Sequence, residues 1–250
     1  SPPWSAGSGL PVTAAMDAAS VAATFTELGG SFVCPPVVLA RHLEKVQGLV
    51  FDWDGVFTTA AKQGSGAVTS FSEADSMGTN MLRFGLWRRG GKLPATVIVT
   101  GENNPTAVEF AQREHFDAVY MGVRNKHHVV QHLETQWKLV PAQLACVFDD
   151  INDLPVAAAC LLRVLVRRAA SPLLRALAIE KKLCDYVTAQ DGSNHAVRET
   201  CELMLGLMGE FDAVVASRTA VDDDYQLYFG QRQSVTTSVF VERQGGIVPL

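Results

Sequence analysis

The segment that decides the fold is LVFDWDGVFT, residues 49–58. It begins with an apolar run typical of a buried strand, after which Asp52 and Asp54 stand one residue apart and Gly55 turns the chain. Two carboxylates this close repel each other unless a cation or a proton lies between them. Mg²⁺ prefers such oxygen ligands and keeps coordination positions free for a phosphate. The segment therefore predicts a strand with an acidic, metal-binding end, although an Asp-Gly pair alone is also common in hairpin turns.

Two later apolar runs rich in β-branched residues end in groups that suit a phosphate. Residues 95–99 lead to Thr100 and Gly101, which offer a hydroxyl and an unobstructed backbone N–H. Residues 118–121 lead to Lys126 at the start of a predicted helix, where a cation is unfavourable unless it reaches an anion. Each feature alone also fits an ordinary turn or a solvated helix residue.

A further apolar run, residues 144–148, ends in Asp149 and Asp150, with Asp153 one turn later. Acidic clusters after a buried strand need a cation or hydrogen-bond donors to offset their desolvation, although a helix cap would also fit here. Strands that alternate with helices predict a parallel α/β sheet, with ligands bound beyond the C-terminal ends of the strands. The four strand ends are therefore expected to form one site.

In order and spacing these motifs resemble those of the haloacid dehalogenase (HAD) superfamily of phosphohydrolases. The matching residues are Asp52-Trp53-Asp54-Gly55-Val56, Thr100-Gly101, Lys126 and Asp149-Asp150. Within the superfamily, approximately residues 46–209 look most like the capless branch typified by 3-deoxy-D-manno-octulosonate 8-phosphate (KDO 8-phosphate) phosphatases. Residues 58–81 resemble its β-hairpin flap and following helix, and residues 185–199 resemble its C-terminal signature.

The chain departs from the family pattern at three places. The family usually has glycine where Phe148 stands and arginine where Glu102 stands, and its glycine-rich tail segment here reads GSNH, residues 192–195. No motif carboxylate is missing, and Lys126 is present. The departures therefore leave the core chemistry intact and put the exact substrate in question.

The resemblance implies a HAD-like Rossmannoid α/β fold of three layers, α/β/α, with a parallel central sheet, a β-hairpin flap and no large cap domain. We expect residues 1–45 to form an N-terminal accessory arm, residues 46–209 the catalytic domain and residues 210–250 a C-terminal extension. Capless members close their open sites by oligomerising. The chain is accordingly expected to be a homo-oligomer, typically a tetramer, with residues 62–69 of the flap at the interface.

The resemblance also implies a Mg²⁺-dependent phosphatase that acts on a small-molecule phosphate ester. Asp52 would be the nucleophile that forms an aspartyl-phosphate, and Asp54 would be the general acid and base. The metal would be held by Asp52, the Asp54 backbone carbonyl and Asp149, while Asp150 or Asp153 would position Lys126 or a water. The residues expected to bind phosphate or substrate are Thr100, Gly101, Lys126 and Arg198.

The implied substrate is a small phosphorylated sugar acid such as KDO 8-phosphate. Because Glu102 removes a basic partner for an anionic substrate, a nine-carbon sialate- or KDN-type 9-phosphate is the alternative. Residues 100–105 also look like the HAD domains attached to some sialate cytidylyltransferases. Two further hypotheses stay open: phosphotransfer to another acceptor, and a non-catalytic HAD-fold module for oligomerisation or regulation.

Composition restricts the class of protein further. The chain has 250 residues, a net charge of −5 and no Lys/Arg run longer than a pair, so we expect no nucleic-acid partner. The longest apolar run, near residues 156–166, is interrupted by Arg163, and the N-terminus has no basic and apolar leader, so we expect no membrane association and no signal peptide.

The cysteines and histidines give weaker signals. The five cysteines form no CxxC pair, which indicates reduced, buried thiols and a cytoplasmic location. His128 and His132 lie four residues apart on a predicted helix, but the glutamate and third ligand of a zinc-hydrolase helix are missing. A transition-metal pair is therefore the less favoured interpretation of these histidines.

Overall fold

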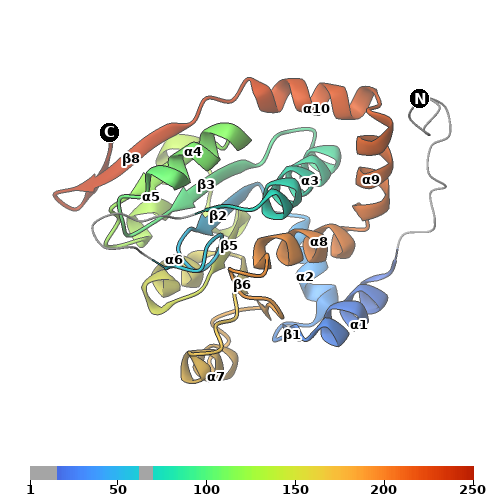
Figure 1. Cartoon of the computed structure of the whole chain (residues 1–250), viewed down its shortest axis with the longest axis horizontal. Helices are drawn as coiled ribbons and strands as arrows, with labels where there is room; N and C mark the ends of the chain where they lie inside the picture. The colour runs from blue at the N-terminus through green and yellow to red at the C-terminus, as the bar shows by residue number, and fades with distance from the viewer. Residues whose placement is uncertain (1–15, 62–69) are drawn as a thin grey trace.

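The computed structural model describes residues 16–61 and 70–250 of the chain (Figure 1). The described residues form one nine-stranded sheet in the order β1-β7-β6-β5-β2-β3-β4-β8-β9. The strands are β1 Ser31–Phe32, β2 Gly48–Asp52, β3 Ala95–Val99, β4 Ala118–Met121, β5 Leu144–Phe148, β6 Leu162–Leu165, β7 Tyr186–Val187, β8 Ser238–Arg243 and β9 Gly246–Pro249.

Helices connect most of these strands. They are α1 Ala18–Leu28, α2 Pro36–Leu43, α3 Glu73–Gly90, α4 Pro105–Glu114, α5 His127–Trp137, α6 Leu154–Ala159, α7 Pro172–Glu180, α8 Ala196–Met208, α9 Phe211–Ala220 and α10 Asp223–Gln233, with short 3₁₀ turns at Pro141–Gln143 and Ile151–Asp153. Proline occupies the first turn of α4, α6 and α7, where its missing N–H costs no hydrogen bond.

The seven strands from β7 to β8 in the sheet order pair in parallel, whereas β1 and β9 pair antiparallel at the two edges. The predicted α/β fold with a parallel central sheet is thus confirmed. Only residues 53–72 lie between β2 and α3, so no large cap domain is inserted there. The predicted flap at residues 62–69 falls outside the described residues, as does the beginning of the N-terminal arm.

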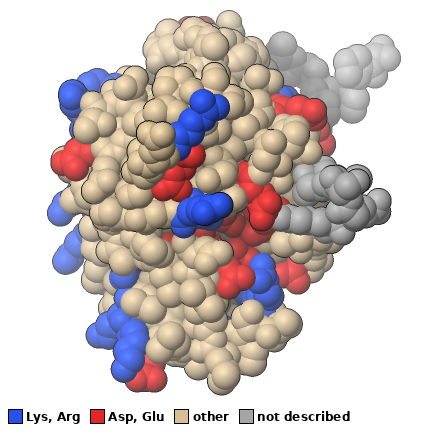
Figure 2. Space-filling view, turned by 90° about the vertical axis from the view of Figure 1, so that its left-hand side faces the viewer, with Lys and Arg blue, Asp and Glu red and all other residues tan. Residues whose placement is uncertain are grey.

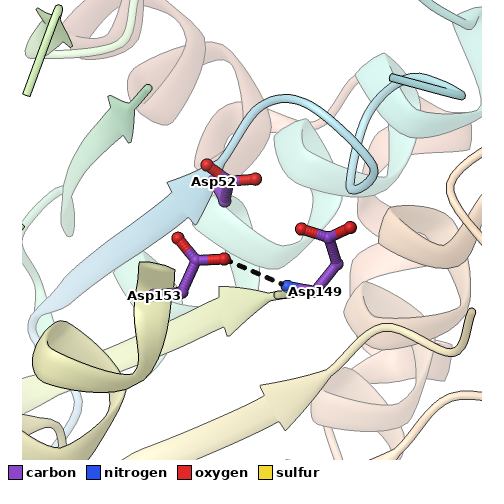
Figure 3. Close-up of side chains that lie close together, drawn as sticks. All are labelled: Asp52, Asp149 and Asp153. Atoms are coloured by element: carbon purple, nitrogen blue, oxygen red, sulfur yellow. Dashed lines mark hydrogen bonds between the residues drawn. The ribbon is translucent and has the colours of Figure 1, made fainter. Parts of the chain in front are cut away.

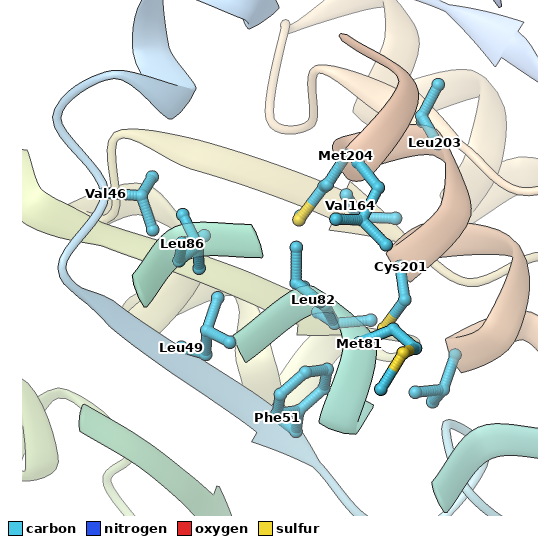
Figure 4. Packing of buried hydrophobic residues seen from close by; sticks show 14 of the residues in the cluster. Val46, Leu49, Phe51, Met81, Leu82, Leu86, Val164, Cys201, Leu203 and Met204 are labelled. Atoms are coloured by element: carbon cyan, nitrogen blue, oxygen red, sulfur yellow. The ribbon is translucent and has the colours of Figure 1, made fainter. Parts of the chain in front are cut away.

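Helices cover both faces of the sheet. Leu49 and Phe51 of β2 pack with residues of α2, α3, α4 and α8, and Figure 4 shows α3 and α8 side chains meeting them. Val50 faces the opposite way, into a second cluster with residues of α5, α6 and α7. Because β2 is buried on both faces, its sequence is a continuous apolar run rather than an alternating one.

The C-terminal residues 211–250 contribute to the same body. Helices α9 and α10 continue from α8 and pack against α3, and β8 extends the sheet beside β4 (Figure 1). Residues 235–241 read VTTSVFV, a composition typical of a strand, and β8 overlaps them. The division into arm, catalytic domain and extension stays a prediction.

All five cysteines are free, and four of them are buried, as predicted. Among the described residues, no helix has both the length and the apolar character needed to cross a bilayer. The cytoplasmic location stays a prediction.

Candidate active site

The predicted motif residues converge at the C-terminal edge of the sheet because their strands are neighbours. Asp52 is the last residue of β2, and β2 lies between β3 and β5. Thr100 directly follows β3 and Asp149 directly follows β5, so both end beside Asp52. Parallel strands in register carry such groups to one edge, where ligands of open α/β sheets bind.

Three carboxylates form the centre of this site. Asp52, Asp149 and Asp153 each offer an oxygen within 4.8 Å of the others, and their exposed fractions are only 8%, 3% and 2% (Figure 3). A buried group of three oxygen donors is the donor set that a hard divalent cation such as Mg²⁺ prefers. The site therefore fits the predicted metal. Asp153, which was expected to position Lys126 or a water, is the third carboxylate of this group.

Lys126 supplies a cation to the same cluster. It caps the N-terminal end of α5, and its Nζ donates to Asp52 Oδ1 at 2.5 Å and also to Asp153 Oδ1. Burial alone would lower the pKa of Lys126, but the two adjacent carboxylates outweigh it and raise the pKa above its usual value. The lysine is thus held in its charged form, and it reaches an anion as its place at a helix start requires.

Asp52 and Asp149 resist full ionisation in the absence of a metal. Burial, with the neighbouring Asp153, raises the pKa of Asp52 despite the opposing charge of Lys126. Burial also raises the pKa of Asp149 to about 7, although the Arg168 guanidinium opposes this shift. A divalent cation would therefore displace protons as it enters the cluster.

We accordingly expect Mg²⁺ to bind about tenfold more tightly at pH 8 than at pH 6, because Asp149 must lose a proton with a pKa near 7. Isothermal titration in buffers of different ionisation enthalpy would measure both the affinity and the protons released. The variant Asp149→Asn should lose the part of the proton release that changes near pH 7. An affinity equal at the two pH values would contradict this assignment.

Arg168 is a functional candidate that sequence reasoning missed. It lies just beyond β6, donates to Asp150 Oδ2 at 2.7 Å from Nη1, and pairs with Asp149 through Nη2. Asp150 is therefore engaged by Arg168, while Asp153 contacts Lys126. Its position could have indicated a role in the site, because Arg168 is a charged residue that follows an apolar run, as the acidic residues of the predicted motifs do.

Asp54 is held by polar partners from the chain after β3. Asn104 donates from Nδ2 to Asp54 Oδ2 at 2.8 Å and to Thr100 Oγ1 at 2.7 Å, and the Thr100 hydroxyl lies 3.4 Å from the same Asp54 oxygen. The other oxygen, Asp54 Oδ1, is buried without a hydrogen-bond partner among the described residues. Gly101 is exposed next to Thr100. Asn104, which sequence reasoning did not select, thus fixes the orientation of the predicted acid.

Close backbone packing shapes the loop after Asp54. Gly55 has φ +88°, and a Cβ there would overlap the Asp149 carboxylate. A Cβ at Gly192 would overlap the carbonyl oxygens of Gly55 and Thr58. The segment before α8 therefore packs tightly against the loop after Asp54, and there is no room for a side chain between them.

Replacing Gly192 by Ala should displace this loop. We expect a stability loss of about 1–3 kcal/mol from overpacking, together with a fall in turnover of at least about tenfold, because small misplacements of reacting groups are costly. Urea denaturation and steady-state kinetics measure the two effects. Gly90→Ala is the matched control, since no atom lies within 4 Å of its Cβ position. Equal behaviour of the two variants would refute the packing argument.

The loop before Lys126 is held from the C-terminal segment. Glu242 of β8 accepts the backbone N–H groups of Arg124 at 2.6 Å and Asn125 at 3.3 Å. Its other oxygen lies 2.7 Å from His128 Nδ1. A strand near the end of the chain thus orders the segment that presents Lys126 to the cluster.

Two predicted groups are not brought into the cluster. The Arg198 guanidinium pairs with Glu202 on the same helix at 2.7 Å, and its backbone N–H donates to Asp75. His132 bonds the Tyr120 hydroxyl at 2.9 Å, whereas His128 faces Glu242. The two histidines thus have separate protein partners, which disfavours a shared transition metal.

Figure 2 shows the side of the molecule that lies at the left of Figure 1. Acidic atoms gather near the centre of this face, and Lys and Arg atoms lie directly beside them. The mixture fits a site in which buried carboxylates are held close to cationic side chains.

Comparison with known proteins supports the motif assignment, although no family model matches the chain. The KDO 8-phosphate phosphatase KdsC of Escherichia coli K12 is 33% identical over 115 residues, which are 46% of this chain and 57% of KdsC. The chain thus spans little more than half the length of the curated relatives it matches.

Solved structures match over a larger part of the chain. A KDO 8-phosphate phosphatase of Yersinia pestis is 26% identical with a TM-score of 0.58, covering 69% of this chain and 88% of that one. A protein of Pseudomonas syringae described as a probable YrbI family phosphatase is also 26% identical, with a TM-score of 0.61 and coverage of 73% and 97%. In fold and in sequence, the chain resembles the HAD phosphatases of the KDO 8-phosphate phosphatase type, as its motifs predict.

Proposed function

We propose that this chain is a Mg²⁺-dependent phosphatase that hydrolyses a small phosphorylated sugar acid. The observation that carries the proposal is the placement of Asp52, whose carboxylate contacts the Lys126 ammonium and offers an oxygen within 4.8 Å of oxygens of Asp149 and Asp153. This arrangement offers a nucleophile, a cation for the phosphate oxygens and oxygen ligands for a metal at one point.

The reaction proceeds in two steps. In the first, an Asp52 oxygen attacks phosphorus, the P–O bond to the sugar breaks, and Asp54 donates a proton to the leaving alkoxide. In the second, Asp54 takes a proton from water, whose oxygen attacks the aspartyl-phosphate and releases inorganic phosphate and the Asp52 carboxylate. Asn104 keeps Asp54 oriented through both steps.

The cations stabilise the charge that develops on the transferring phosphoryl group. Lys126 contacts its equatorial oxygens, and Thr100 with the Gly101 N–H orients it. A Mg²⁺ ion held by Asp52 and Asp149, with Asp153 or the Asp54 carbonyl, would supply further neutralisation of that charge. Arg168 and Lys126 keep the remaining carboxylates from repelling the substrate.

The substrate class follows from the relatives. Two of the three proteins compared above are named as KDO 8-phosphate phosphatases, and they are 33% and 26% identical to this chain over the matched parts. Glu102, in place of the usual arginine, keeps a nine-carbon sugar-acid 9-phosphate as the second substrate to test. We further propose that the protein acts as a homo-oligomer, which light scattering after gel filtration would reveal.

The deciding experiment measures phosphate release from a panel of sugar phosphates and sugar-acid phosphates, with Mg²⁺ and with a chelator. KDO 8-phosphate and a sialate 9-phosphate are tested side by side. Release that requires Mg²⁺ and favours the acids is the expected result. Silence across the panel from a folded protein would instead favour the non-catalytic module.

A further inference from the structure

A pocket of about 390 Å³ lies beside the loop after Asp54 and is not used by the chemistry above. Thr58 and Thr59, a few residues after Asp54, form part of its wall, and Ser72, Ser193 and His195 form another part. Hydroxyl groups predominate among these side chains, so the pocket suits a polyhydroxylated ligand. Its volume is large enough for the sugar portion of a phosphate ester.

His195 is the one titratable side chain among the described residues that line this pocket. It stands at the N-terminal end of α8 with φ +65°, a left-handed conformation that favours glycine. Its ring is 52% exposed, and Nδ1 lies 3.7 Å from Asp75 Oδ2. Because Nδ1 faces Asp75, the other ring nitrogen, Nε2, is available to a ligand in the pocket.

Asp75 lies behind the histidine, on the side away from its Nε2. The carboxylate is completely buried on α3, and its Oδ1 accepts the Arg198 N–H at 2.9 Å. Its Oδ2, however, has no hydrogen-bond partner among the described residues. A buried carboxylate with one oxygen unsatisfied favours a hydrogen-bond donor beside it, and the N-terminus of α8 adds partial positive charge that attracts an anion to the same place.

We propose that His195, backed by Asp75, binds the carboxylate of the sugar acid and so selects acidic substrates. This inference rests on the proposed function, in which the phosphate occupies the cluster of Asp52 and Lys126. The sequence analysis named Arg198 among the substrate-binding residues, but the Arg198 guanidinium is already paired with Glu202. His195 is a specificity-determining residue in this assignment, and Asp75 is a positioning residue.

The test measures binding rather than turnover, using the Asp52→Asn protein with Mg²⁺. Two probes, 6-phosphogluconate and glucitol 6-phosphate, differ only in a carboxylate against a CH₂OH group. We expect the acid to bind about 5- to 10-fold more tightly, as for a charge-assisted hydrogen bond at a half-exposed site. His195→Gln and His195→Gly should reduce this preference to about one.

The variants are matched to exclude loss of structure. His195→Gly should fold at least as well as its parent, because glycine accepts φ +65° without strain. His42→Gln, on α2 shortly before the start of β2 and outside the lining of the pocket, should keep the full preference. Asp75→Asn, which keeps an acceptor for the Arg198 N–H, should weaken the preference without abolishing binding of glucitol 6-phosphate.

The outcomes separate this inference from the proposed function. A preference that survives in both His195 variants, or that is absent from the parent, overturns the assignment even if the wild type releases phosphate. Absence of Mg²⁺-dependent turnover by the wild type, with a His195-dependent preference intact, overturns the proposed phosphatase and leaves an anion-binding pocket.

Discussion

The variant Asp52→Asn is expected to lose phosphatase activity by about 10³- to 10⁶-fold, as enzymes do when a catalytic nucleophile is removed. The amide has nearly the shape of the carboxylate but cannot form an aspartyl-phosphate. Lys126 loses its ion pair with Asp52 but keeps the one with Asp153, so the cation of the phosphate site is retained. Single-turnover measurements with excess Mg²⁺ would establish the loss in the chemical step rather than in metal binding.

Asp54→Asn provides the informative comparison, because it keeps the nucleophile and removes the acid. With an aryl phosphate, whose leaving group needs no proton, this variant should still release a burst of phenolate and then stall as aspartyl-phosphate. Asp223→Asn, at the exposed start of α10, should behave as wild type. Appreciable metal-dependent hydrolysis by Asp52→Asn would rule out its role as nucleophile.

The largest expected effect on stability comes from Glu114. This residue of α4 is 3% exposed, accepts a hydrogen bond from Ser76 Oγ at 2.6 Å and pairs with Arg232 of α10 at 2.6 Å. Removing it leaves the buried Arg232 cation without its carboxylate, and such a change costs about 3–5 kcal/mol. For a chain of this size, that loss lowers the Tm by about 10 °C.

Urea denaturation of Glu114→Ala would measure this loss. Glu73→Ala is the matched control, because Glu73 also pairs with an arginine, Arg113, but its side chain is 78% exposed. An exposed ion pair contributes about 0–1 kcal/mol. If the two variants lost similar stability, the buried Glu114–Arg232 pair would contribute no more to the free energy of unfolding than an exposed pair.

The central strands could be predicted because they are buried on both faces. The apolar runs at residues 95–99, 118–121 and 144–148 coincide with β3, β4 and β5. Such strands appear in a sequence as uninterrupted β-branched runs. Because parallel strands end at one edge, the convergence of Asp52, Thr100 and Asp149 followed from the fold class.

The rest depended on contacts between distant segments. Arg168 and Asn104 look like ordinary surface residues in the sequence, and only the structure shows that they hold Asp149 and Asp54. The antiparallel edges and the pairing of β8 with β4 had no local signal either, because the register of distant strands depends on the whole sheet. Glu242 lies 118 positions from Arg124, whose N–H it accepts.

That last contact has a consequence for synthesis. Chains emerge from the ribosome N-terminal end first, and the early strands can begin to fold before the later ones exist. Here the loop that leads to Lys126 lacks its Glu242 partner until β8 has emerged and paired with β4. A nascent chain stalled before residue 238 would thus hold every motif residue and still lack the ordered lysine loop, so catalytic competence should appear only late in translation.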